Sequence, residues 1–404
     1  MPTRYGASPW IAESPKARRP DFPRLRGEHT CDVVIVGGGL TGCATAYACA
    51  MAGLKPLIID ADRVGQGSSG RSGGLLLSEP GPSFRDLAQA HGLRSARQVF
   101  EAWARGASDG AAILKRLKAP GGVSAANDVL VGFRGDEKAL QREHGARDQA
   151  GVPSRWLSER QVIPVTRLDA VALRLRDGFA VDPYRACATL AVAASRRGGA
   201  FYERSPVRKV TAGRKGAEVV TADGVVHAGT VIVTTGIATA EFKQLRRHFK
   251  RRETYMVMTA PVPAAVRKLI LPTDTTIRDA RIPHHRIRWT ADSRLLVSGA
   301  DQDETAAKKR DAILVQRTGQ LMYELLMAYP AISGLRPGFG WESTYAETAD
   351  GLIYAGPHRN YPRHLFALGG DGQSLTGSFL AARVLARAAA GVPDKADQVF
   401  GWTR

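Results

Sequence analysis

A glycine-rich turn near the N-terminus constrains the fold of this chain more than any other sequence feature. Residues 37–42 (GGGLTG) fit the pattern G-x-G-x-x-G. They follow the apolar, β-branched run 32–36, which predicts a buried parallel strand. The alanine-rich stretch 41–52 predicts a helix, and Gly53 is placed to end it. This order of strand, turn and helix predicts a Rossmann-type dinucleotide-binding unit.

Each part of such a unit has its own physical task. Gly37 allows the tight turn, Gly39 lets backbone N–H groups approach a pyrophosphate, and Gly42 allows close packing of helix on strand. The N-terminus of the helix supplies partial positive charge to the phosphates. A second predicted strand, 56–59, ends in Asp60, whose carboxylate can accept a hydrogen bond from a ribose hydroxyl.

Three further segments favour FAD over NAD. The loop 65–74 (GQGSSGRSGG) is rich in small residues and backbone donors, which suits an extended cofactor. The run 231–236 (VIVTTG) predicts a late buried strand that ends beside a ligand. Residues 365–377 predict a strand, a glycine-rich turn and the start of a helix that continues to about 390. That helix start favours the negative charge that a flavin ring gathers on reduction, and a nicotinamide has no evident use for it.

The predicted FAD contacts come from all of these segments. They are Gly37, Gly38, Gly39, Thr41, Gly42, Asp60, Ala61, Ser69, Arg71, Ser72, Gly73, Val207, Thr235, Gly236, Gly370, Asp371, Gly372, Gln373, Ser374, Leu375 and Thr376. Arg71 is included because its loop offers few other reasons for a fixed charge. Asp371 has two interpretations, a residue that tunes the flavin or an N-cap of the last helix.

The chain resembles the D-amino-acid oxidase-like (DAO) family of FAD-dependent oxidoreductases, most of all its gamma-glutamylputrescine oxidase branch. The motifs that carry the resemblance are 5–10 (YGASPW), 70–74 (GRSGG), 181–183 (VDP), Trp341 with 348–351 (TADG), and the C-terminal glycines. The resemblance implies FAD, a two-domain fold and oxidation of a C–N bond of an amine.

The expected fold class is α/β (α+β), with a Rossmann-type FAD-binding domain and a discontinuous substrate domain on a mixed or antiparallel sheet. The expected division is an N-terminal arm 1–26, which either wraps the domain or stays loose, an FAD domain of 27–80, 150–250 and 346–404, and a substrate domain of 81–149 and 251–345. Strands at 254–259, 275–278, 286–290 and 295–298 are expected to roof the flavin, with a helix from about 305 to 329 behind them.

The expected chemistry belongs mainly to the cofactor. A neutral amine loses hydride to flavin N5, and water hydrolyses the resulting imine. We find neither a nucleophile elbow nor a cluster of metal ligands, so we expect no metal. His284 and His285 precede a roof strand and could bind or deprotonate substrate, although a solvent-facing pair is the alternative. Tyr255 and Tyr345 could form an aromatic cage, although half-buried core tyrosines are equally expected.

Departures from the family pattern narrow these expectations. The resemblance implies an arginine four positions after Trp341 that clamps an α-carboxylate, and Tyr345 stands there. We therefore expect an amine without that clamp. A flavin-linking cysteine would align near Ser343, but no cysteine follows Cys187, so FAD is expected to be non-covalent. An oxygen-activating lysine would align near Val297, where none occurs, so oxygen and another electron acceptor both remain open.

Charge and composition limit partners and location. The net charge is +19, and its densest run, 243–252 (KQLRRHFKRR), is expected to be a solvated helix face rather than a nucleic-acid site. No apolar run predicts a membrane span, and the N-terminal residues lack the apolar block of a secretory signal. The four cysteines include no C-x-x-C pair and are expected to be buried small residues rather than disulfides, so a reducing cytoplasm is expected. Two alternatives stay open: a D-amino-acid or N-methyl-amino-acid dehydrogenase, against which Tyr345 speaks, and a non-catalytic flavin-binding protein whose basic face meets an anionic partner.

Overall fold

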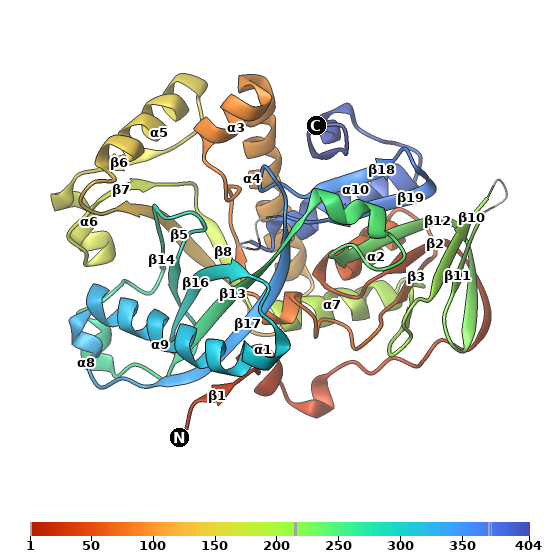
Figure 1. The fold of residues 1–404 in the computed structure, drawn as a ribbon, viewed down its shortest axis with the longest axis horizontal. Helices are drawn as coiled ribbons and strands as arrows, with labels where there is room; N and C mark the ends of the chain where they lie inside the picture. Colours follow the sequence, from red (N-terminus) through yellow and green to blue (C-terminus); the bar gives the residue numbers. More distant parts are fainter. Residues whose placement is uncertain (1, 214–215, 371, 373) are drawn as a thin grey trace.

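Two sheets that lie side by side organise the chain (Figure 1). The structure is a computed structural model and describes residues 2–213, 216–370, 372 and 374–404. The small sheet has the order β10-β11-β12-β2-β3-β9, with the hairpin β18-β19 joined to β12. Its strands are β2 (Gly27–Val36), β3 (Pro56–Ile59), β9 (Ala200–Tyr202), β10 (Lys209–Ala212), β11 (Ala217–Val220), β12 (Gly224–Gly236), β18 (Tyr354–His358) and β19 (Tyr361–Leu368).

The small sheet is buried on both faces, which explains its continuous apolar runs. Strand β2 pairs in parallel with β3 and β12, and β12 pairs in parallel with β19. Val33 and Ile35 pack against the helices on one face, in one core cluster. Val34 and Val36 pack in a separate cluster on the other face. Because the side chains on both faces of β2 are buried, this strand needs no polar face. The continuous apolar run 32–36 predicts such a buried strand.

Ten α-helices occur in the described residues, and several cover the small sheet. They are α1 (Pro9–Ala12), α2 (Leu40–Met51), α3 (Phe84–His91), α4 (Leu93–Arg116), α5 (Glu137–Ala150), α6 (Glu159–Thr166), α7 (Pro183–Ser195), α8 (Ala264–Arg267), α9 (Arg310–Ala328) and α10 (Thr376–Ala389). Asp182 caps α7 by accepting a hydrogen bond from the Arg185 N–H. None of these helices is both long and apolar enough to cross a membrane.

The large sheet is mixed, as expected from the sequence. Its order is β1-β17-β13-β16-β15-β14-β5-β7-β6, with β4 and β8 paired at its side. Its strands are β1 (Arg4–Tyr5), β4 (Leu75–Leu76), β5 (Val123–Gly132), β6 (Arg155–Leu157), β7 (Val171–Arg174), β8 (Gly178–Val181), β13 (Lys250–Thr259), β14 (Thr275–Asp279), β15 (Arg286–Trp289), β16 (Leu295–Asp303) and β17 (Pro337–Glu347). Helix α9 packs on one face of it through Leu314 and Leu321.

Two of the expected domain boundaries need correction. The segment 150–250 was assigned to the FAD domain, but its strands β6, β7 and β8 pair into the large sheet. The segment 81–149 was assigned to the substrate domain, but α4 packs Trp103 into the core under the small sheet. Strand pairing and helix docking between segments far apart in sequence leave no local pattern, which is why the boundaries were misplaced.

The N-terminal arm and the basic run also have defined places. Strand β1 pairs in parallel with β17, and the Ser8 hydroxyl donates to the Gly70 carbonyl at 2.6 Å, so the arm wraps the fold. The basic run 243–252 is not the expected α-helix. Residues Lys243–His248 form a 3-10 helix, and the run then enters β13, where Arg252 pairs with Asp303 at 2.5 Å.

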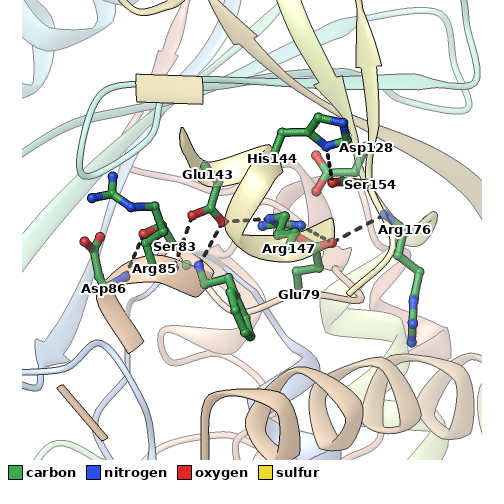
Figure 2. A network of polar contacts seen from close by, with 12 residues as sticks. Glu79, Ser83, Arg85, Asp86, Asp128, Glu143, His144, Arg147, Ser154 and Arg176 are labelled. Atoms are coloured by element: carbon green, nitrogen blue, oxygen red, sulfur yellow. Dashed lines mark hydrogen bonds and ion pairs between the residues drawn. The ribbon is translucent and has the colours of Figure 1, made fainter. Parts of the chain in front are cut away.

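A buried charged network ties α5 to the large sheet (Figure 2). Arg147 donates to Glu143 at 2.7 Å and to Glu79 at 2.9 Å. Arg278 lies 3.1 Å from Glu79 and 3.2 Å from Asp128. Burial alone would raise the pKa of Glu79, but the charges of Arg147 and Arg278 lower it. The two arginines are therefore matched by buried carboxylates, and the network is a structural brace.

Candidate active site

A cavity of about 630 Å³ lies between the two sheets. Its floor is the glycine turn, the end of β12 and the start of α10, all in the half of the molecule that holds the small sheet. Its roof is made by β13, β15, β16 and β17 of the large sheet. The loop 67–75 contributes to the wall between them. The cavity thus joins the predicted dinucleotide site to the predicted substrate site.

The glycine turn has the geometry that a dinucleotide needs. Gly37 has a φ of 109°, which favours glycine. A Cβ at Gly42 would lie 1.8 Å from the Gly37 carbonyl oxygen, so helix and strand could not pack as they do. In the first turn of α2 the Leu40 N–H donates to Ser69 Oγ at 2.9 Å, while the N–H groups of Thr41 and Gly42 have no acceptor within the helix and can bind a phosphate. These residues fit the pyrophosphate of FAD.

The Asp60 carboxylate accepts two backbone hydrogen bonds. Its Oδ2 accepts the Gly38 N–H at 2.5 Å, and its Oδ1 accepts the Asp62 N–H at 2.8 Å. Burial raises the pKa of Asp60, and these two N–H groups partly oppose the rise. The carboxylate therefore fixes the glycine turn while it also lines the cavity. A ribose hydroxyl would be a further donor to the same carboxylate.

Most of the predicted FAD contacts line this cavity. They are Gly37, Gly39, Thr41, Asp60, Ala61, Ser69, Ser72, Gly73, Val207, Thr235, Gly236, Gly370, Gly372, Ser374 and Leu375. Gly38 and Gly42 are not among the described lining residues, but an added Cβ would come within 3.1 Å of Asp60 at Gly38 and within 1.8 Å of the Gly37 carbonyl oxygen at Gly42. Thr376 is fully buried and donates to the Leu77 carbonyl at 2.7 Å. Asp371 and Gln373 lie outside the described residues.

Arg71 is not part of the cavity wall, contrary to our expectation. Its Nη1 lies 3.2 Å from Glu342 Oε1 and donates to the Glu342 carbonyl at 3.3 Å. The carbonyl of Arg71 accepts the Trp341 indole N–H at 2.8 Å. The fixed charge that we assigned to a flavin contact instead ties the loop to β17, because an acid on that strand lies within reach.

Tyr255 faces away from the cavity. Its neighbours Thr254 and Met256 line the roof, and the alternation of a strand turns Tyr255 to the opposite face. Its hydroxyl donates to Glu253 at 2.8 Å, and its ring joins the core beneath α9. The expected aromatic cage therefore lacks one of its two members, and the alternative of a core tyrosine holds for Tyr255.

The histidine pair is structural and neither lines the cavity nor faces solvent. His284 is 8% exposed, and its Nδ1 lies 2.6 Å from the Asp279 carbonyl oxygen. Burial lowers the pKa of His284 to about 3, and the charges of Arg278 and Arg286 add to this. His285 accepts the Ala300 N–H at Nε2, so its Nδ1 donates to Glu324 at 2.7 Å. Both rings serve the fold, because the loop before β15 turns inward.

Tyr345 does lie in the cavity wall. A Cβ on Gly372 would lie 2.5 Å from its ring, so the glycine-rich turn packs directly on it. The Tyr345 hydroxyl donates to Asp301 Oδ2 at 2.8 Å. Burial and the nearby charge of Asp301 raise the pKa of Tyr345, which stays a neutral phenol. The side chain forms an aromatic wall whose hydroxyl is already engaged.

Arg286 and Arg288 are cavity residues that the sequence reasoning missed. Both come from β15, line the roof and are at most 4% exposed. Strand pairing places Arg286 opposite Ser298 and Arg288 opposite Leu296, and these partners line the cavity too. The available signal was the alternation R-I-R within a strand expected to roof the flavin, which puts both arginines on one face.

Comparisons with known proteins agree with this geometry. A family model described as FAD dependent oxidoreductase (DAO) matches residues 32–388. The chain is 26% identical to gamma-glutamylputrescine oxidoreductase of Escherichia coli (strain K12), over 93% of this chain and 87% of that protein. It is 22% identical to glycine oxidase of Bacillus licheniformis, over 84% of this chain and 87% of that protein.

Solved structures share the fold. Glycine oxidase from Geobacillus kaustophilus superposes with a TM-score of 0.75 at 22% identity, over 93% of this chain and 99% of that chain. L-amino acid deaminase from Proteus myxofaciens, in complex with anthranilate, superposes with a TM-score of 0.74 at 17% identity, over 96% of this chain and 96% of that chain. The chain is therefore an enzyme of the FAD dependent oxidoreductase (DAO) family.

Proposed function

We propose that this enzyme oxidises a C–N bond of a small amine or amino acid and uses non-covalent FAD. The single observation that carries the proposal is the continuous cavity between the glycine turn and the roof strands. A dinucleotide on the turn would extend its flavin toward the roof, where a substrate would meet it. The names of the relatives, gamma-glutamylputrescine oxidoreductase and glycine oxidase, support the same class of reaction.

The residues of the chain bind, orient and exclude water. Bound FAD would supply the hydride acceptor at flavin N5, and water would hydrolyse the imine that the substrate becomes. Leu296 and Met256 contribute apolar side chains to the roof, and Tyr345 forms the wall beside the glycine-rich turn. Such a site keeps bulk water from the reacting carbon. No histidine acts as base in this proposal, since His284 and His285 are engaged elsewhere.

The surroundings of the cysteines support dissociable FAD. Cys43, Cys49 and Cys187 are buried, and burial raises the pKa of each thiol. Neither these three nor Cys31 is among the described residues that line the cavity. The position expected for a linking cysteine is Ser343, whose hydroxyl donates to the Ser68 carbonyl at 3.4 Å. Flavin should therefore leave the polypeptide on acid precipitation.

The proposal also covers the electron acceptor, the cellular location of the enzyme and two alternative functions. Either oxygen or another electron acceptor reoxidises the flavin, and we expect the enzyme to work in the cytoplasm without nucleic acid. A D-amino-acid or N-methyl-amino-acid dehydrogenase is the second candidate, and the arginines in the roof favour it. A flavin-binding protein without catalysis would keep its colour when amines are added.

The test is anaerobic bleaching of the purified yellow protein by a panel of amines and amino acids. We expect at least one compound to bleach the yellow colour of the bound flavin, and air or an added electron acceptor to restore it. Gly42→Ala should abolish FAD uptake because of its contact with Gly37, whereas Gly145→Ala, with no neighbour within 4 Å of the added Cβ, should keep it. Protein that takes up no FAD under any condition would overturn the proposal.

A further inference from the structure

Two side chains of the N-terminal arm bind the loop 70–73, part of which lines the cavity. Ser8 Oγ donates to the Gly70 carbonyl at 2.6 Å. The Trp10 indole N–H donates to the Ser72 carbonyl at 2.9 Å. Neither Ser8 nor Trp10 is among the described residues that line the cavity, so the arm holds this loop from outside the cavity.

Two side chains of the large sheet bind the other carbonyl groups of the same loop. The Trp341 indole N–H donates to the Arg71 carbonyl at 2.8 Å, and Arg288 Nε donates to the Gly73 carbonyl at 2.7 Å. The four consecutive carbonyl groups of 70–73 are thus engaged alternately by the arm and by the large sheet. Because a carbonyl oxygen is an acceptor like those of a flavin ring, a loop that binds flavin through its backbone must present N–H groups instead.

The Trp10 hydrogen bond sets the direction of one such N–H group. In a trans peptide, the C=O of one residue and the N–H of the next point in opposite directions. The Ser72 carbonyl points to Trp10, so the Gly73 N–H points away from the arm. This N–H has no acceptor among the described residues, and Gly73 lines the cavity. An added Cβ at Gly73 would have only Leu296 within 4 Å, at 3.9 Å, so a ligand can come close to this backbone.

The arm is itself anchored to both halves of the molecule. Before Ser8, strand β1 pairs with β17 of the large sheet. After Trp10, Leu25 is buried in a core cluster of the small sheet, and its N–H donates to Ser205 Oγ at 2.9 Å. The Trp10 ring also lies 5.4 Å from Arg288 Cζ, within the range of a cation–π contact. A loop held by an element that is fixed at both ends is preorganised, so a ligand does not have to order it.

We propose that Ser8 and Trp10 are positioning residues for the cofactor, which fix the loop 70–73 so that the Gly73 N–H is available to bound FAD. This inference rests on the proposed non-covalent FAD, since only a dissociable cofactor has an affinity that can change. Without the two hydrogen bonds, the loop would adopt other conformations. The affinity for FAD would then fall in proportion to the fraction of molecules that keep the binding conformation. The arm thus serves to retain FAD and does not contact the substrate.

Dilution of the yellow holoprotein tests this, because the fluorescence of released flavin gives the Kd for FAD. Trp10→Phe keeps an aromatic ring beside Arg288 but removes the N–H, and it should weaken FAD binding about 2- to 10-fold, as for the loss of one hydrogen bond. Ser8→Ala should have an effect of the same size. Tyr5→Phe is the matched control on the same arm, because its hydroxyl has no hydrogen-bond partner among the described residues, and it should leave the Kd unchanged.

The outcomes separate the two proposals. Flavin that stays with the wild-type polypeptide after acid precipitation would overturn non-covalent FAD and, with it, this inference. If wild-type protein releases FAD while Trp10→Phe keeps the wild-type Kd, only the positioning role is wrong. This holds even where the free energy of unfolding of the variant falls, because Trp10 would then serve the fold alone. Where Trp10→Phe does not fold, the Kd of Ser8→Ala decides in the same way.

Discussion

Two sets of buried arginines lie in this molecule in opposite surroundings. Arg147 lies between Glu79 and Glu143 (Figure 2). Arg278 lies between Glu79 and Asp128, so every one of these charges has a partner of opposite sign. Arg288 is equally buried but has backbone carbonyls and an indole ring around it. The difference teaches that a buried arginine can be held in place by carboxylates that match its charge or by backbone carbonyls and an aromatic ring that do not.

Breaking the paired set should have the largest effect. Arg147→Met leaves Glu79 and Glu143 buried without their shared cation, which should lower the free energy of unfolding by about 3–5 kcal/mol. Urea unfolding followed by circular dichroism measures it. Arg142→Met on the same helix is the control, because Arg142 is exposed and bonds only to the Lys138 carbonyl in the described structure. A loss below about 1 kcal/mol, the scale of a surface pair, would contradict the brace.

Tyr345 provides a third case, in which a neutral hydroxyl rather than an arginine donates to a buried acid. Tyr345→Phe removes the hydroxyl that donates to Asp301 at 2.8 Å and should cost about 2 kcal/mol of stability, as for a hydrogen bond to a charged group. The phenyl ring should still pack on Gly372, so FAD content should stay at the wild-type level. Complete loss of turnover with normal FAD content would instead give the hydroxyl a part in the reaction.

His284 should give the smallest effect, visible as a pH dependence. It is neutral when folded because its pKa falls from 6.5 to about 3. Its contribution to stability is therefore complete above pH 6.5 and is lost as the pH falls toward 3, since the unfolded state binds the proton first. Between pH 7 and 5.5 this should amount to about 1 kcal/mol. His284→Gln should flatten that part of the stability curve, and an unchanged slope would mean that folding does not lower the pKa of His284.

Local features of the sequence were sufficient to predict the elements that form the floor of the cavity. The turn 37–42, helix α2 and Asp60 stand where the pattern placed them, and the predicted mixed sheet is present. The roof was harder to predict. Its strands β13 and β15 lie near their expected positions, but the sequence left two alternatives open for Tyr255, and the core tyrosine is the one observed.

The sequence by itself determined the class of cofactor and the family. The positive φ of Gly37 and the close contact between Gly42 and the Gly37 carbonyl involve residues only five positions apart, so a local sequence pattern can predict them. Only the tertiary structure decided which charges meet. Pairing of β15 with β16 turns Arg288 to the cavity, whereas α5 brings Arg147 to Glu79 from a distant segment. The side chains of a strand point to two opposite faces, and the elements packed on the strand decide which face borders the cavity.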